Sequence, residues 1–220
     1  MNNYKSVLRE IKEITNVLVE KGISANQNYP INKNHNDKSV CVEWSNISNL
    51  SIALKNREYR EIYNELDKNR DYNIKLLDGA LIHFMYKFKG DELISHRLAF
   101  YPSPYLENYQ NEPELYERDE IYADVIYKNI VAFPIRFDYN KDEVESEYYH
   151  PKSHVTLGQY KNCRIPAYGP ISPVVFIKFI FKNFYSKVYY VLEGLESSCN
   201  LFSCIEPKEE EELHFNIKNN

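Results

Sequence analysis

The stretch from residue 136 to residue 164 gathers side chains that could cleave a phosphodiester bond. The candidates are two imidazoles, His150 and His154, two guanidiniums, the Asp138 carboxylate and the Thr156 hydroxyl. Metal-free RNA cleavage needs a base for the 2′-hydroxyl, an acid for the leaving oxygen and a cation for the phosphorane. Histidine suits the first two roles because its pKa lies near neutrality. Arginine suits the third as a permanently charged, bidentate donor.

These residue types suggest a division of roles within one site. In a strand, alternate residues share a face, so Arg136 and Asp138 would point the same way, as would His154 and Thr156. We predict that Asp138 orients a histidine. The predicted site consists of His150, His154 and Asp138 as catalytic residues, Arg97, Arg136, Lys152 and Arg164 as phosphate ligands, and Thr156 and Gln159 as auxiliary polar residues.

Other interpretations of the same residues stay open. Arg136 and Asp138 could pair on a surface, where an ion pair contributes about 0–1 kcal/mol, and Arg97 could pair with an acid from 106–124. His150, His154 and Asp138 could instead hold a divalent ion, because neutral imidazoles and a carboxylate are common ligands. Our preferred prediction has no metal and no cofactor.

Charge is unevenly distributed around this stretch. Residues 106–147 carry 12 acidic and 4 basic residues, whereas residues 151–192 carry 6 basic residues and no acidic one. A segment without carboxylates suits phosphate or another anion. The alternative is that part of it is a buried helix, in which acids would be costly.

Several elements must position these side chains. Apolar residues recur at helical spacing over 3–21 and 57–69, which predicts two amphipathic helices. Alternation predicts strands over 40–44, 51–55, 73–101, 129–140, 154–160 and 163–168, with Lys89-Gly90-Asp91 as a hairpin turn. Pro134 inside one strand implies an edge or a bulge. The polar stretch 24–37 is predicted to be a loop.

The apolar stretch after residue 172 predicts the helix at the centre of the core. Ser172 and Pro173 form a strong helix start, a hydroxyl cap followed by proline, and the helix should run to about Val191. The predicted class is α+β: an antiparallel sheet packed on this buried C-terminal helix, with the N-terminal helix alongside. We expect one domain over residues 1–205 and an acidic tail over 206–220 that could return as an edge strand.

Composition limits the environment and the partners. The net charge of −5 argues against wholesale electrostatic binding to nucleic acid or membrane. No apolar run approaches the length of roughly 20 residues that a membrane span needs, and the charged N-terminus does not resemble a signal peptide. The four cysteines lack the spacing of a zinc or redox motif. We expect a cytoplasmic protein with RNA or a nucleotide as partner and no membrane.

The segment 150–185 resembles a bacterial family of uncharacterised proteins, known only by a domain-of-unknown-function label. The resemblance is carried by HPKSHVTLGQ (150–159), CRIP (163–166), PISP (170–173) and FIKFI (176–180). Its members have a similar length, so the resemblance would cover nearly the whole chain. It implies a prokaryotic, cytoplasmic protein encoded among mobile or defence genes. It brings no established activity.

The order Arg136, Asp138, His150, His154 is also similar to that of small toxins of toxin–antitoxin pairs. Those toxins often have a further histidine where this chain has Thr156. This likeness favours a toxin-like or defence-associated nuclease that cleaves RNA by metal-independent histidine acid/base chemistry. The alternatives are a non-catalytic module that binds a neighbouring-gene protein of such a system, and a nucleotide sensor.

Overall fold

The computed structural model describes residues 3–45, 47, 57–105, 132–142, 150–160, 163–199 and 201. The helices are α1 (Asn3–Glu20), α2 (Tyr59–Lys68), α5 (Pro173–Phe184) and the 3-10 helix η3 (Ser186–Leu192). The strands are β1 (Ser24–Gln27), β2 (Pro30–Asn34), β3 (Ser39–Trp44), β4 (Ile74–Leu76), β5 (Leu81–Lys89), β6 (Glu92–Tyr101), β7 (Ile135–Asn140), β8 (Ser153–Leu157) and β9 (Ile165–Pro166). The class is α+β, as predicted.

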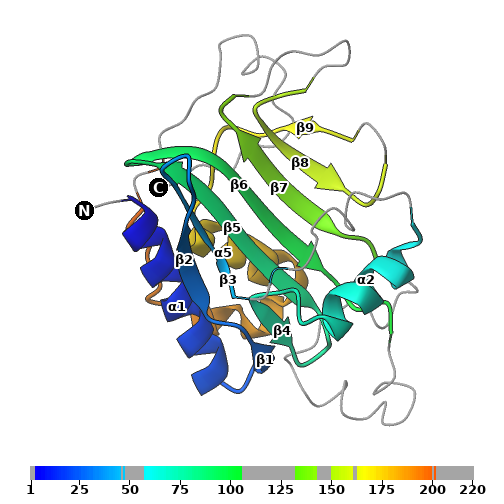
Figure 1. The fold of residues 1–220 in the computed structure, drawn as a ribbon. Coiled ribbons are helices and arrows are strands. Elements are labelled where there is room, and N and C mark those ends of the chain that lie inside the picture. Colours follow the sequence, from blue (N-terminus) through cyan, green and yellow to red (C-terminus); the bar gives the residue numbers. More distant parts are fainter. Residues whose placement is uncertain are drawn as a thin grey trace.

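The strands form one antiparallel sheet in the order β1-β4-β5-β6-β7-β8-β9, and the β2–β3 pair joins it through β5. The sheet is twisted, with α1 and α5 against one face and α2 near the end of the other (Figure 1). The long β5–β6 hairpin lies at its centre, and the turn between the two strands contains Gly90 with φ +63°. This confirms the predicted hairpin.

The main core lies between the sheet and the helices α1 and α5. One residue from each of four adjacent strands is buried on this side, and these residues are paired across the sheet: Phe84, Leu98, Phe137 and Val155. The ring of Phe176 in α5 packs edge-on against the rings of Phe84 and Phe137. Helix α5 begins as predicted, because the Ser172 hydroxyl accepts a hydrogen bond from the Val175 amide. The predicted buried helix therefore does form the centre of the core.

Three boundary predictions were wrong. Residues 24–37 contain two strands, β1 and β2, rather than a loop; both lie at sheet edges, where polar residues hide the strand pattern. Helix α5 ends at Phe184 instead of near Val191, because buried Tyr185 leaves helical geometry and its hydroxyl donates to Asp78. Pro134 precedes β7, which is a central strand, rather than lying in an edge or bulge.

Other predicted segments lie outside the described residues. These are the strand over 51–55, residues 106–131 and 143–147 of the acidic stretch 106–147, and the tail over 206–220.

A buried carboxylate ties the N-terminal helix to the rest of the fold. Glu10 of α1 is fully buried, and its Oε1 accepts hydrogen bonds from the Cys199 amide at 2.9 Å and the Ser197 hydroxyl at 3.0 Å. Its Oε2 accepts from the Val174 amide in the first turn of α5 at 3.4 Å. A carboxylate at a helix N-terminus is also favoured by the helix dipole. Glu10 thus joins α1, α5 and the segment after η3.

Replacing Glu10→Ala is expected to lower the free energy of unfolding by about 3 kcal/mol, because the buried amides lose a charged acceptor. Urea denaturation of the variant and the parent protein measures this loss. Glu13→Ala is the matched control, since Glu13 is exposed and its carboxylate lies 3.7 Å from Arg9 Nε in a surface ion pair, and it should cost less than about 1 kcal/mol. Equal losses for the two variants would contradict this account.

Candidate functional site

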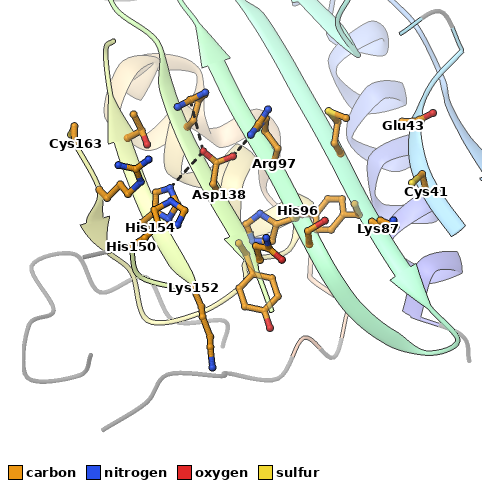
Figure 2. Close-up of a pocket in the computed structure, with 18 of the residues that line it drawn as sticks. Cys41, Glu43, Lys87, His96, Arg97, Asp138, His150, Lys152, His154 and Cys163 are labelled. Atoms are coloured by element: carbon orange, nitrogen blue, oxygen red, sulfur yellow. Dashed lines mark hydrogen bonds and ion pairs between the residues drawn. The ribbon is translucent and has the colours of Figure 1, made fainter. Parts of the chain in front are cut away.

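The sheet face opposite α1 and α5 carries a row of polar side chains across its central strands. Met85 of β5 is paired with Arg97 of β6, Arg97 with Asp138 of β7, and Asp138 with His154 of β8. Because cross-strand partners project from the same face, the register alone brings these side chains together. Figure 2 shows Arg97, Asp138 and His154 pointing into the same pocket.

Asp138 lies at the centre of this row. Its Oδ1 accepts a hydrogen bond from Arg97 Nε at 2.7 Å, and its Oδ2 lies 3.9 Å from both Arg136 Nε and His154 Nε2. Burial raises the pKa of Asp138, but the two guanidiniums outweigh this effect and the net pKa is lowered. Asp138 is therefore ionised at neutral pH.

The neighbouring row contains His83, Ala99, Arg136 and Thr156, paired in that order across the same four strands. Arg136 is nearly buried, and its Nη1 has no hydrogen-bond partner among the described residues. A buried N–H without an acceptor is costly. This guanidinium can therefore gain substantially from an anion bound in the pocket.

The two predicted histidines are in contact, with ring centroids 4.8 Å apart. The Pro151 carbonyl accepts a hydrogen bond from His154 Nδ1 at 3.0 Å, so in the neutral imidazole the lone pair lies on Nε2. Burial lowers the pKa of His154 more than the Asp138 carboxylate raises it. His154 is thus a neutral imidazole at pH 7 with Nε2 unprotonated, which is the form of a general base.

These side chains line a cavity of about 510 Å³ that opens on the sheet face. Five basic side chains contribute to its wall, Lys87, Arg97, Arg136, Lys152 and Arg164, against two acidic ones, Glu43 and Asp138. The formal charge of the wall is therefore positive by three even with all histidines neutral. In a chain of net charge −5, this concentration of cations favours an anionic ligand.

The structure gathers most of the predicted site residues in this cavity. Arg97, Arg136, Asp138, His150, Lys152, His154, Thr156 and Arg164 all line it. Gln159 does not, because its side-chain amide donates to the Arg57 carbonyl at 2.7 Å. Asp138 is not within hydrogen-bond distance of His154; the Pro151 carbonyl orients that ring, and Asp138 instead binds Arg97.

Sequence reasoning missed the opposite wall of the cavity. Cys41 and Glu43 of β3, and Met85 and Lys87 of β5, also line it. Alternation within β5 would have put Met85 and Lys87 on one face, but only the strand order places β5 beside β6 and β3 beside β5.

The metal alternative has no matching ligand set in the described part of the chain. No group of three or more His, Cys, Asp and Glu side chains there has an arrangement that could hold a metal ion. Asp138, His150 and His154 lie in one cavity, yet the carboxylate is engaged by Arg97.

Fold and site together define an α+β protein with a cationic, histidine-bearing cavity on the open face of an antiparallel sheet. The chain belongs to the family of uncharacterized conserved proteins DUF2290, whose model matches residues 22–217. Comparison with curated proteins gave no match, and comparison with solved structures gave none either. Among the described residues, no helix has the length and apolar character needed to cross a membrane.

Proposed function

We propose that this protein is a cytoplasmic ribonuclease that cleaves RNA by metal-independent acid/base catalysis. The observation that carries the proposal is the convergence of a neutral, oriented imidazole with guanidiniums in one cavity. His154 Nε2 lies 3.9 Å from Asp138, and the side chains of His150, Arg136 and Arg164 line the same cavity. The partly matching order of toxin residues supports a toxin-like or defence-associated role.

The proposed chemistry uses each of these groups once. His154 Nε2 takes the proton of the 2′-hydroxyl as its oxygen attacks phosphorus, and the resulting imidazolium lies beside the Asp138 carboxylate. Arg97, Arg136 and Arg164 stabilise the negative charge of the phosphorane. His150 donates a proton to the 5′-oxygen as its bond to phosphorus breaks. The products are a 2′,3′-cyclic phosphate and a 5′-hydroxyl.

The test is cleavage of labelled single-stranded RNA by purified protein in EDTA, and again with added Mg²⁺ or Mn²⁺. Cleavage is expected in EDTA, and His154→Ala should slow it about 10²- to 10⁴-fold, the usual contribution of a general base. An RNA with one 2′-deoxynucleotide should resist cleavage at that position, because the attacking hydroxyl is missing.

His35→Ala is the matched control, since His35 is exposed and belongs to the β2–β3 turn. Thermal melts confirm that each variant is folded, and added imidazole should partly restore the activity of His154→Ala. Full activity of folded His154→Ala would refute the proposed base. Cleavage only with added ion would favour the metal alternative instead.

The alternative proposal is a protein-binding module of a toxin–antitoxin or anti-phage defence system. Absence of cleavage under every condition, combined with co-purification of a neighbouring-gene product, would favour it. A nucleotide-dependent rise in melting temperature without turnover would favour a sensor, because a ligand that binds only the folded state stabilises it.

A further inference from the structure

Two exposed aromatic residues lie on either side of Gly158, and one of them lines the cationic cavity. Tyr160, in the turn after β8, is 79 % exposed, and Phe133, just before β7, is 40 % exposed. Tyr160 also lines the cavity, together with Arg164 and His150. Tyr160 differs from Tyr190, another exposed tyrosine, because its ring also lines the cavity and is therefore available to a ligand bound there.

Gly158 lies between these two aromatic residues. Its amide donates to the Pro134 carbonyl at 2.7 Å, which joins the end of β8 to the start of β7. A Cβ atom built on Gly158 would lie 3.7 Å from both Phe133 Cβ and Tyr160 Cδ2. Gly158 also has φ +64°, a conformation that favours glycine. The two aromatic residues therefore flank one glycine, on two different segments of the chain.

Hydrogen bonds link Tyr160 to Cys163 and Cys163 to the end of β8. The Cys163 amide donates to the Tyr160 carbonyl at 3.2 Å, and Cys163 Sγ accepts from the Leu157 amide at 3.4 Å. The next residue, Arg164, contributes a cation to the cavity. The exposed ring of Tyr160 thus lines the same cavity as the Arg164 guanidinium.

The exposed ring and the cationic wall beside it match the base and the phosphate of a nucleotide in a single strand. A ring face stacks on a base, and a cationic wall binds the adjoining phosphate; each stacked base contributes about 1–3 kcal/mol. A base within a duplex is already stacked and paired, so it could not use the ring. We infer that Tyr160, flanked by Phe133, is a base-stacking platform, and that the substrate is single-stranded nucleic acid with an unpaired base beside the bound phosphate. This inference rests on the proposed function.

The test compares Tyr160→Ala, Tyr160→Trp and Tyr190→Ala on a short oligouridylate and on the same oligomer with single abasic positions. Tyr160→Ala is expected to raise KM about 5- to 150-fold with little change in kcat, which corresponds to the loss of one stacked base. Tyr160→Trp should retain the parental KM. Tyr190 is 60 % exposed on η3, outside the cavity, and its variant should behave as the parent.

The abasic oligomers separate stacking from a structural effect. On the oligomer whose abasic position removes the stacked base, the KM of the parent should rise by the factor that Tyr160→Ala causes on the intact oligomer. The KM of Tyr160→Ala should rise no further on that oligomer. If the KM of Tyr160→Ala on the intact oligomer is within twofold of the parental KM, the inference is overturned. It is also overturned if the variant's KM exceeds the parent's by the full factor at every abasic position.

Binding of a fluorescein-labelled 2′-deoxy analogue, measured by anisotropy, tests the platform without requiring cleavage. The Kd of Tyr160→Ala is expected to exceed the Kd of the parent by the same factor as its KM does. If the protein binds in this way but cleaves no RNA, the proposed catalysis fails while the stacking site stands. If it cleaves RNA with no dependence on residue 160, the stacking site fails while the catalysis stands.

Discussion

Acidification from pH 7.5 to pH 4 is expected to remove roughly 6 kcal/mol from the free energy of unfolding, because two histidines are buried as neutral side chains. Burial lowers the pKa of His83 to about 3 and that of His96 to about 4. In the unfolded chain both would titrate near 6.5. A loss of this size approaches the whole stability of a typical domain.

The surroundings of the two rings explain why neither accepts a proton readily. His83 is 1 % exposed and lies between the rings of Trp44 and Tyr101, at 4.9 and 4.7 Å, with Arg97 adding repulsion. His96 Nε2 accepts a hydrogen bond from the Ile171 amide at 3.2 Å. Protonation of this nitrogen would remove the acceptor and leave two donors facing each other.

The sign follows from proton counting. Above pH 6.5 both histidines are neutral in the folded and the unfolded chain, so their contribution does not change with pH. Below 6.5 the unfolded chain binds protons that the folded chain does not, and stability falls as pH decreases toward 4. With two histidines the slope approaches about 3 kcal/mol per pH unit.

Urea denaturation at pH 7.5, 6, 5 and 4.5, followed by the fluorescence of Trp44, measures this slope. Trp44 is the single tryptophan of the chain and is buried. His83→Phe keeps an aromatic ring between its neighbours and should roughly halve the slope. His35→Asn should leave it unchanged. An unaltered slope in His83→Phe would show that acid sensitivity arises elsewhere.

Local patterns in the sequence predicted the elements of the site well. Alternation along β6 put Arg97 and His96 on opposite faces. In the structure both residues line the cavity, but Arg97 pairs with Asp138 there, whereas His96 Nε2 accepts a hydrogen bond from the Ile171 amide on the side of α5. The hairpin turn at Gly90 and the cap at Ser172 followed from residues whose backbone preferences are strong.

Contacts between distant segments could not be predicted in the same way. Arg97 and Asp138 are 41 residues apart, and only the register of β6 against β7 makes them partners. A shift of one residue would turn either side chain to the core face. The hydrogen bond by which the Pro151 carbonyl orients His154 could not be predicted either, since every residue has a backbone carbonyl and the sequence does not show which one binds a side chain.

Asp138→Asn is expected to lower the free energy of unfolding by about 3 kcal/mol, the lower end of the cost of breaking a buried ion pair. The Asp138 and Arg97 side chains are 14 % and 28 % exposed, so solvent screens part of the effect. The substitution leaves both Arg97 and Arg136 without their shared counter-charge. The carboxylate's contribution is present above its unfolded pKa and is lost as pH falls through its lowered folded pKa.

Two further variants distinguish an ion-pair effect from general damage. Arg97→Gln combined with Asp138→Asn removes both charges and should recover part of the lost stability, because no uncompensated charge remains from that pair. Glu92→Gln removes one partner of the exposed pair with Lys141 and should cost less than about 1 kcal/mol. Urea titrations of all three variants provide the comparison.

Asp138→Asn also tests the chemistry assigned to His154. The carboxylate raises the pKa of His154 against the larger, opposite effect of burial. Its removal should therefore move the acidic limb of the kcat/KM profile to lower pH, in addition to slowing cleavage through loss of the ion that faces the imidazolium. A purely structural role for Asp138 would lower the amount of folded protein without moving that limb, so the pH profile of the folded fraction decides between the two.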